Sequence, residues 1–311
     1  MVTRCARLVA VANAICLTLL SATSYAQQGT QQAVAPSVPV AVFVFSNITG
    51  EPADDWMGTG IAETVATLDI IARGNFIFGV GVGYREVEFN AFNVPKGKRV
   101  QRFEEYLELV HRLWTEDTVS HDSETCKLDN VHMNIRPVQQ PGPPIWVGAN
   151  NDRAVMRAAR VGDSWFVSPH STIGTSLRQL ELYRTELKAC GKPFPDELPL
   201  MKELYCAKDR ATAMQKAGPY LSAKYQDYAK WGQDGAMPED ESFDQGFEDL
   251  IKDRFIIGSP EECYEQLKPY WEQLGVNHLI FRTHWAGMPV ADATASINLI
   301  SKELLPELRK L

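Results

Sequence analysis

The amino-acid sequence predicts an α/β protein with a parallel sheet, because short apolar strands alternate with helical segments along most of its 311 residues. Two turns carry most of the functional information. One strand closes at Gly81–Gly83 and another runs into Gly148–Asn151, and each leads towards a helix. Such turns expose backbone N–H groups that can hold an anionic cofactor. With 45% hydrophobic residues, the chain can bury a large core.

The N-terminus has the pattern of an export leader. Arg4 and Arg7 precede the apolar run 8–20, and small residues stand before a cleavage point after Ala26. The run is shorter than the roughly 20 residues that span a bilayer, so a membrane anchor or a core helix is the weaker alternative. We expect residues 1–26 to be a signal peptide, the mature chain to be periplasmic or secreted, and no membrane segment to remain after cleavage.

The first half of the mature chain begins irregularly. Residues 27–39 are small and polar and predict a linker, and the Val-rich run Val40–Phe45 predicts a buried strand. Glycines and prolines in Asn47–Gly60 predict a segment that is mostly loop. Apolar spacing over Ile61–Ala72 then predicts a helix packed on a sheet, and Phe76–Val82 predicts the strand that ends in the first glycine turn.

From Arg99 onwards the alternation is regular. We expect helices at Arg99–Trp114, Arg153–Val161, Ser176–Cys190, from Ala211, over Phe243–Arg254, at Pro260–Leu274 and from Ala291. We expect strands at Ile145–Val147, Ser164–Val167, Leu200–Ala207 and His278–Arg282. Alternating residues in Thr118–Asn134 predict an inserted hairpin. Together with Val40–Phe45 and Phe76–Val82, the strands of this alternation make about six strand–helix units. Eight close a parallel barrel, so the sequence predicts an incomplete barrel with exposed strand edges.

Composition excludes several classes of function. A net charge of −8 without a cluster of Lys and Arg argues against nucleic acid as a partner and favours a small-molecule substrate. The cysteines of the mature chain form no CxxC pair, so we expect no metal site; they are Cys126, Cys190, Cys206 and Cys263. We expect them to be buried thiols, and a disulfide between two of them is the alternative. We find no Ser-His-Asp series, HExxH or Walker motif, which leaves redox chemistry carried by a bound cofactor.

Four ordered blocks resemble the luciferase-like flavin- or deazaflavin-dependent monooxygenase family. They are ATLDIIARGNFIFGVGVGYREVEFNAF, KRVQRFEEYLELVHRLW, PPIWVGANNDRAVMRAARVGDSW, and the pair GSPEECYEQL and GVNHLIFRTHWAGMP. The resemblance covers residues 63–311. It implies a TIM-barrel fold, an oxidoreductase of the monooxygenase type, and FMN or, alternatively, a deazaflavin coenzyme. A small organic substrate would then enter over the loops that follow the strands, including the Thr118–Asn134 insertion.

The same resemblance assigns the candidate site. It places Gly81, Val82, Gly83 and Tyr84 beside the cofactor ring, and it places Gly148, Ala149, Asn150 and Asn151 around the phosphate. Some relatives have an arginine where Val82 stands. Gly81 and Gly83 have an alternative role, which is to relieve steric crowding inside a packed strand. The alternative for the turn at Gly148–Asn151 is that Asn151 or Asp152 only caps the next helix.

Other side chains have weaker assignments. Arg282 and His284 follow the last strand and are expected to face the substrate. We expect Arg99 and Arg102 to pair with nearby glutamates on an exposed helix face. The aromatic set Tyr220, Tyr225, Tyr228 and Trp231 is expected to serve packing.

The front of the barrel is replaced in this chain. The run VAVFVFSNITGEPADDWMGTGIAETVAT, residues 40–67, resembles the start of a TolB-like segment, and we place the expected domain boundary after residue 62. The resemblance implies three earlier strand–helix steps, which include the acid/base histidine of several relatives. Strand Val40–Phe45 stands where the third would be and the other two have no counterpart, so no catalytic residue is assigned. We therefore expect a fusion, and the alternative function is a vestigial barrel fragment that binds a flavin or an anion without turnover. A homodimer is also possible.

Mass spectrometry of the native protein tests the fusion. We expect peptides that span Gly58–Arg73, because these residues join the TolB-like segment to the luciferase-like segment. Recovery of peptides from both segments without any that cross this junction would contradict a single joined chain.

Overall fold

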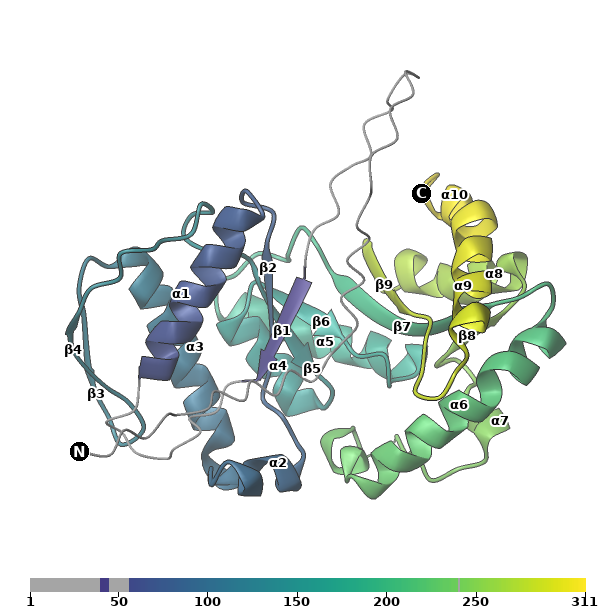
Figure 1. Cartoon of the computed structure of the whole chain (residues 1–311), viewed down its shortest axis with the longest axis horizontal. Coiled ribbons are helices and arrows are strands. Elements are labelled where there is room, and N and C mark those ends of the chain that lie inside the picture. Colours follow the sequence, from purple (N-terminus) through teal and green to yellow (C-terminus); the bar gives the residue numbers. More distant parts are fainter. Residues whose placement is uncertain (1–39, 45–55, 240) are drawn as a thin grey trace, which may run out of the picture. The chain divides into compact units, whose positions relative to one another are not determined.

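The computed structural model describes residues 40–44, 56–239 and 241–311, with side chains from Thr59 onwards (Figure 1). The chain divides into two units, residues 1–37 and 38–311, and every described residue belongs to the second. The expected signal peptide and linker lie outside the described residues.

In the described residues of the second unit, seven parallel strands form a central sheet. Its strands are β1 (Val40–Val44), β2 (Ile77–Gly81), β5 (Ile145–Ala149), β6 (Ser164–Val167), β7 (Pro199–Cys206), β8 (Ile256–Gly258) and β9 (His278–Arg282). They follow the order β1-β2-β5-β6-β7-β8, and β9 pairs with β7. This confirms the parallel α/β class and a sheet with fewer strands than the eight of a closed barrel. The expected number of six was one too low, because β8 has only three residues and follows a segment with a helical pattern.

The helices follow the strands as expected, with three differences. They are α1 (Trp56–Ile71), α2 (Glu86–Ala91), α3 (Arg99–Thr115), α4 (Asp152–Val161), α5 (Ile173–Ala189), α6 (Arg210–Lys230), α7 (Phe247–Leu250), α8 (Pro260–Glu272), α9 (Val290–Leu299) and α10 (Leu305–Leu308). Helix α1 begins at Trp56, so the expected loop up to Gly60 is wrong for its last residues, and α1 also crosses the expected domain boundary at residue 62. Helix α2 was not expected, and the helical pattern over 243–254 yields only the short α7.

Strand β7 holds the second half of the sheet together. It pairs with β6 through Leu200, with β9 along Pro199–Glu203, and with β8 along Leu204–Cys206. A single strand therefore carries three parallel partners. Its burial is nearly complete, which fits a strand covered on both faces.

The inserted segment forms the expected hairpin, with β3 (Val119–Asp122) paired antiparallel to β4 (Lys127–Val131). The hairpin lies along α3, where Tyr106 donates a hydrogen bond to the Thr125 carbonyl at 3.1 Å. The Glu105 carboxylate of α3 accepts hydrogen bonds from His121 at 2.7 Å and from two hydroxyl groups of the hairpin. These contacts attach the hairpin to a helix on the outside of the sheet.

Trp114 joins the elements that support β2. Its indole N–H donates to the Ala62 carbonyl of α1 at 3.1 Å, and its ring packs edge-on against Phe78 at 6.0 Å. Helices α1 and α3 lie side by side as a result (Figure 1). On the far side of the indole, a Cβ built on Gly142 would lie 2.4 Å from the ring. Only glycine fits between the loop before β5 and this tryptophan.

Substitution of Gly142 tests this packing. Gly142→Ala should lower the free energy of unfolding by about 1–3 kcal/mol, because the added methyl group must displace a buried indole ring. Urea unfolding measures the change. Gly174→Ala is the matched control: its added methyl meets nothing within 4 Å, so stability should stay within about 0.5 kcal/mol. Equal effects of the two substitutions would contradict the packing role of Gly142.

Candidate functional site

The two glycine turns lie next to each other at one edge of the sheet. Strands β2 and β5 pair in parallel, with Val80 opposite Val147, so their carboxyl ends reach the same edge. A Cβ built on Gly148 would lie 3.5 Å from the Val80 carbonyl oxygen. Among the described side chains, nothing lies within 4 Å of a Cβ built on Gly81. The structure therefore brings the two predicted turns together, and the described side chains leave open space beside Gly81.

The first turn changes direction at Gly83. Its φ of +78° lies in the left-handed region, which favours glycine. Val82 and Tyr84 flank it and are half-buried. Burial, together with the nearby Tyr228 hydroxyl, raises the pKa of Tyr84 to about 12. Tyr84 therefore keeps its proton at neutral pH and offers an O–H group at this edge.

The second turn starts α4, and its last residue caps that helix. The Asn151 side chain accepts a hydrogen bond from Ala154 N–H at 3.0 Å, so the N-cap role is confirmed. Asn151 also donates to the Ala236 carbonyl at 3.4 Å, and Gln179 donates to the Asn150 carbonyl at 2.7 Å. These bonds hold the turn from two other parts of the chain. A capped helix of this length still presents its first N–H groups and the positive end of its dipole.

Charges near this helix start are paired. Asp152, the first residue of α4, forms an ion pair with Arg178 at 2.6 Å. Although burial opposes the shift, hydrogen bonds from Arg178 and Gln179 hold the pKa of Asp152 below its usual value. The carboxylate therefore does not add an unpaired negative charge to the turn.

The neighbouring helix α3 also begins at this edge, and its start is basic. It follows Lys98, has no side-chain cap, and carries no acidic residue in its first turn. The expected pairing of Arg99 and Arg102 with glutamates is wrong: Arg99 donates to the Lys96 carbonyl, and Arg102 is 9% exposed. Glu104 instead pairs with Arg157 of α4 at 3.2 Å. Sequence spacing within one helix missed this link between two helices.

A buried carboxylate organises the same edge further along the sheet. Glu203 of β7 is fully buried, and the Trp285 indole N–H donates to it at 2.6 Å. Lys224 of α6 forms an ion pair with it, and the Arg282 guanidinium lies 3.6 Å away. We call Glu203, Lys224, Tyr225, Arg282 and Trp285 the Glu203 cluster. Neither Glu203 nor Lys224 was predicted, because only the fold brings them together.

Of the two side chains predicted to face the substrate, Arg282 belongs to the Glu203 cluster and His284 does not. Arg282 also contacts the Tyr228 hydroxyl, which together with Glu203 raises the pKa of Arg282 despite its burial. His284 is exposed, and its Nε2 lies 3.1 Å from the Met288 carbonyl oxygen within a turn. Arg282 is therefore held at the edge, whereas His284 is bound to its own loop. Tyr225, expected only to pack, belongs to the cluster through its contact with Glu203, and Tyr228, also expected only to pack, contacts Arg282.

Two lysines, Lys202 of β7 and Lys224 of α6, have lowered pKa values. Burial lowers the pKa of Lys224 to about 8, although Glu203 opposes the shift. Burial also lowers the pKa of Lys202 to about 7, helped by the nearby Arg254. Lys202 donates to the Ser171 carbonyl at 3.0 Å, on the opposite face of the strand from Glu203. Both amines can lose a proton near physiological pH.

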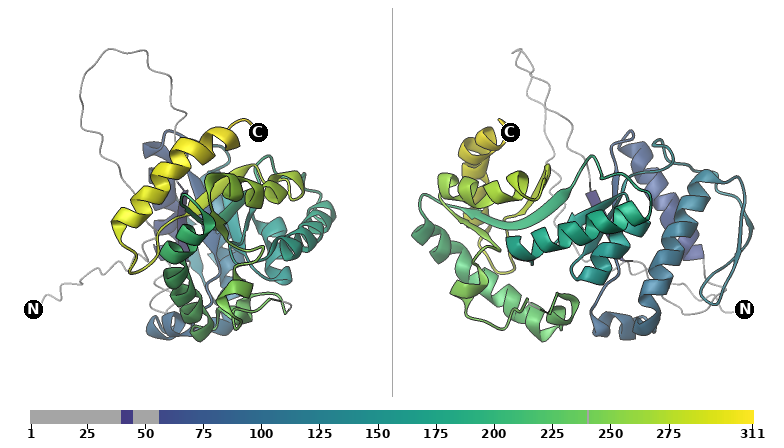
Figure 2. Two further views of the ribbon diagram at one scale, coloured as in Figure 1. Left: turned by 90° about the vertical axis from the view of Figure 1, so that its right-hand side faces the viewer. Right: turned by 180° about the vertical axis from the view of Figure 1, so that it is seen from behind.

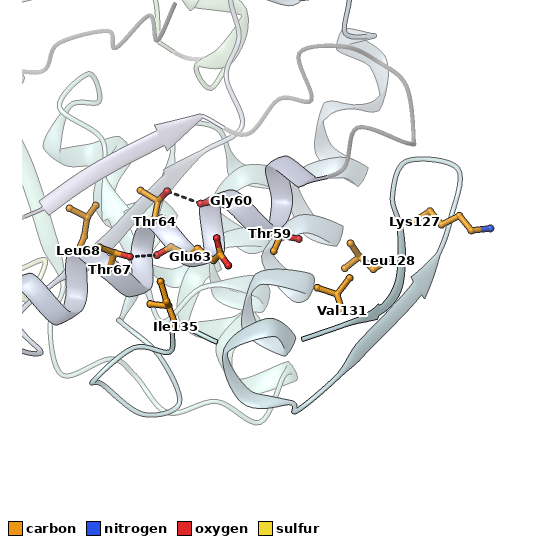
Figure 3. A pocket seen from close by; sticks show the side chains of 10 residues that line it. All are labelled: Thr59, Gly60, Glu63, Thr64, Thr67, Leu68, Lys127, Leu128, Val131 and Ile135. Carbon is orange, nitrogen blue, oxygen red and sulfur yellow. Dashed lines mark hydrogen bonds between the residues drawn. The ribbon is translucent and has the colours of Figure 1, made fainter. Parts of the chain in front are cut away.

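Two cavities lie away from the glycine turns. One, of about 830 Å³, lies between α1 and the β3–β4 hairpin and is lined by residues such as Glu63, Leu68, Leu128 and Ile135 (Figure 3). The other, of about 1340 Å³, lies between α3 and the loop before β5. Neither includes a residue of either turn. The hairpin thus borders a separate groove instead of the predicted cofactor edge, which corrects its expected part in substrate entry.

Two classes of site find no support in the part of the chain that the structure describes. Residues 56–239 and 241–311 contain no grouping of His, Cys, Asp and Glu that could hold a metal ion. Across the same described residues, no helix has both the length and the apolar character needed to cross a membrane.

Comparison with known proteins identifies relatives along most of the chain. The model of the luciferase-like monooxygenase family matches residues 58–278. A protein of Amycolatopsis mediterranei named F420-dependent glucose-6-phosphate dehydrogenase is 27% identical over 264 residues, which are 81% of this chain and 75% of that protein.

Solved structures show the same fold. The monooxygenase RslO1 from Streptomyces bottropensis gives a TM-score of 0.70 at 24% identity, and the alignment covers 81% of this chain and 74% of that chain. The oxygenating constituent of 3,6-diketocamphane monooxygenase from Pseudomonas putida, solved with FMN, gives 0.63 at 18% identity over 80% of this chain and 76% of that chain. The barrel resemblance inferred from the four sequence blocks is therefore confirmed.

The lowered pKa values of Lys202 and Lys224 make the free energy of unfolding depend on pH. Between pH 7 and about 10, the unfolded chain binds more protons than the folded chain at Lys202 and Lys224, so the free energy of unfolding should rise with pH. We expect a rise of about 3–4 kcal/mol between pH 7 and pH 9 for the two lysines together, measured by urea unfolding.

Lys202→Met should flatten this slope, because the buried amine is removed, whereas the exposed Lys268→Met should leave it unchanged. A free energy of unfolding that is constant or falls over this pH range would show that both lysines stay charged in the folded protein.

Proposed function

This chain belongs to the luciferase-like monooxygenase family, and from that premise we propose that it is an oxidoreductase that acts on a small organic substrate. The proposed cofactor is reduced FMN, with the deazaflavin coenzyme as the alternative, bound at the carboxyl edge of β2 and β5. A flavin or deazaflavin supplies the hydride or oxygen chemistry, while the protein supplies binding, orientation and exclusion of water.

The observation that carries this proposal is the pair of adjacent glycine turns. Open space next to Gly81 lets a flat ring approach the backbone closely, and Gly148 keeps the neighbouring strand end free of a side chain. The residues present therefore fit a cofactor with a planar ring and an anionic tail. Side chains larger than a methyl group at these two positions would fill the space that the ring needs.

Each part of the edge has a proposed task. The N–H groups at the start of α4, held by the Asn151 cap, would bind the phosphate, and the basic start of α3 would add attraction. Backbone from Gly81 to Tyr84 would border the ring. The Glu203 cluster would form the substrate side, with Arg282 as a hydrogen-bond donor held in place by Glu203 and Tyr228.

The relatives include proteins that use either of the two proposed cofactors. The named dehydrogenase of Amycolatopsis mediterranei uses F420, and the Pseudomonas putida structure holds FMN. Both cofactors combine a tricyclic ring with a phosphate-bearing tail, so the same two turns would serve either. Export by the leader and a homodimer stay predictions that accompany this proposal.

A second candidate function is binding of a flavin or an anion without turnover. The open sheet favours it: within the described residues β1 pairs only with β2, and β9 only with β7. A barrel that lacks closure shields its mouth less well from water, which weakens catalysis more than binding. Consumption of a reduced cofactor separates the two functions, because only the oxidoreductase turns it over with a substrate panel.

Filling the space beside Gly81 tests the cofactor site. Gly81→Val should weaken FMN binding by about tenfold or more, because the new side chain occupies the position of the ring, whereas no described side chain lies within 4 Å of the added Cβ. Quenching of flavin fluorescence gives the Kd, and thermal unfolding checks the fold.

Gly60→Ala is the control, since its methyl also meets nothing within 4 Å but lies on α1 by the hairpin groove. The control should bind FMN as the native protein does. The proposal fails if the native protein binds neither FMN nor the deazaflavin coenzyme, or if Gly81→Val binds them unchanged.

A further inference from the structure

His170 occupies the same edge of the sheet as the glycine turns. Strand β6 pairs with β5 through Val167 opposite Ala149, so the residues that follow the two strands emerge side by side. His170 is half-buried. Three aromatic rings surround its imidazole at centroid distances of 5.4–5.8 Å, and they belong to Tyr225, Tyr228 and Phe243.

A chain of hydrogen bonds fixes which nitrogen of His170 carries the proton. The Tyr225 hydroxyl lies 3.0 Å from His170 Nδ1 and 3.5 Å from Glu203 Oε1. Glu203 has no proton to give, because Lys224 and Trp285 both donate to it. Only one arrangement makes both contacts hydrogen bonds: His170 Nδ1–H donates to the Tyr225 oxygen, and Tyr225 O–H donates to Glu203.

This arrangement leaves Nε2 of His170 as an acceptor. A neutral imidazole has one N–H and one nitrogen with a free lone pair, and the Nδ1–H is already committed to Tyr225. Among the described residues, Nε2 has no hydrogen-bond partner. The nitrogen that is free to meet a ligand is thus one that accepts a proton or a hydrogen bond.

The surrounding charges keep the imidazole neutral. Burial and the nearby cations lower the pKa of His170 well below its usual value. The titratable and charged groups around it are Lys202 and Glu203 of β7, Lys224, Tyr225 and Tyr228 of α6, Glu241 and Arg254 on either side of α7, and Arg282 of β9. Burial and the guanidinium groups of Arg282 and Arg254 disfavour a positive imidazolium.

We propose that His170 Nε2 accepts a hydrogen bond from a hydroxyl group of the substrate, and that it selects substrates carrying a hydroxyl on an apolar or aromatic skeleton. The apolar part follows from the three rings that line the imidazole. This inference rests on the proposed function, because it assigns a substrate contact at the same edge. A site built to receive an O–H group discriminates against the matching ether, which leaves the acceptor unpaired.

Matched fluorinated probes test the selectivity. 4-Fluorophenol and 4-fluoroanisole differ at the O–H, and ¹⁹F NMR gives their dissociation constants without any added cofactor. We expect the native protein to bind the phenol about fivefold or more tightly than the ether. His170→Phe keeps an aromatic ring in place and should abolish the preference. Equal binding of the two probes, or a preference that survives His170→Phe, would overturn the proposal.

The protonation of His170 can be read directly, which keeps the proposal testable if the variant does not fold. In ¹⁵N-histidine spectra of the native protein between pH 6 and 8, we expect Nδ1 protonated and Nε2 unprotonated. Tyr225→Phe should shift the proton towards Nε2, and Tyr220→Phe on the same helix should not. A protonated Nε2 in the native protein would overturn the proposal.

Neither experiment depends on the cofactor. Failure of the His170 proposal would leave FMN binding and its loss in Gly81→Val unchanged, so the two failures are distinguishable.

Discussion

The parallel pairing of β2 with β5 is the constraint on which the site depends. Because the two strands are neighbours in one register, their glycine turns end at one edge and cannot separate without breaking the sheet. Trp114 fixes β2 from one side by packing on Phe78 and bonding to α1. Asn151 and Gln179 fix the turn after β5 from the other side. The backbone N–H groups are thus positioned before any ligand arrives, which lowers the cost of ordering on binding.

The second organising feature is the buried charge of Glu203. A carboxylate without exposure to water is stable only when donors surround it, and here an indole, an ammonium and a guanidinium do so. The same charge sets the direction of the Tyr225 hydroxyl and through it the state of His170. One buried group on β7 therefore governs side chains from β6, α6 and β9. Figure 2 shows these elements from two further directions.

The sequence predicted the parts of this structure that depend on local pattern. Strand Ser164–Val167 and helix Arg99–Trp114 were predicted almost to the residue, because apolar periodicity and helix starts are local signals. The turn at Gly148–Asn151 was also found from local residues, including its capping asparagine. Three-residue β8 was missed, since so short an apolar run gives no periodicity.

The Glu203 cluster could not be predicted from one sequence. Its members come from β7, α6, β9 and the loop after β9, and no spacing rule links residues that far apart. The only local signal was Glu203 next to Lys202 within a strand whose other residues are mostly apolar, since charged residues are seldom buried without partners. The pairing of Arg157 with Glu104 is similar, because it joins two helices that meet only in the folded chain.

Backbone amide NMR during titration with FMN or the deazaflavin coenzyme tests the central claim most directly. The account predicts that amide signals of residues 81–84 and 148–151 shift together and saturate at the same ligand concentration. Shifts confined to the groove between α1 and the hairpin, or to only one of the two turns, would contradict a shared cofactor site.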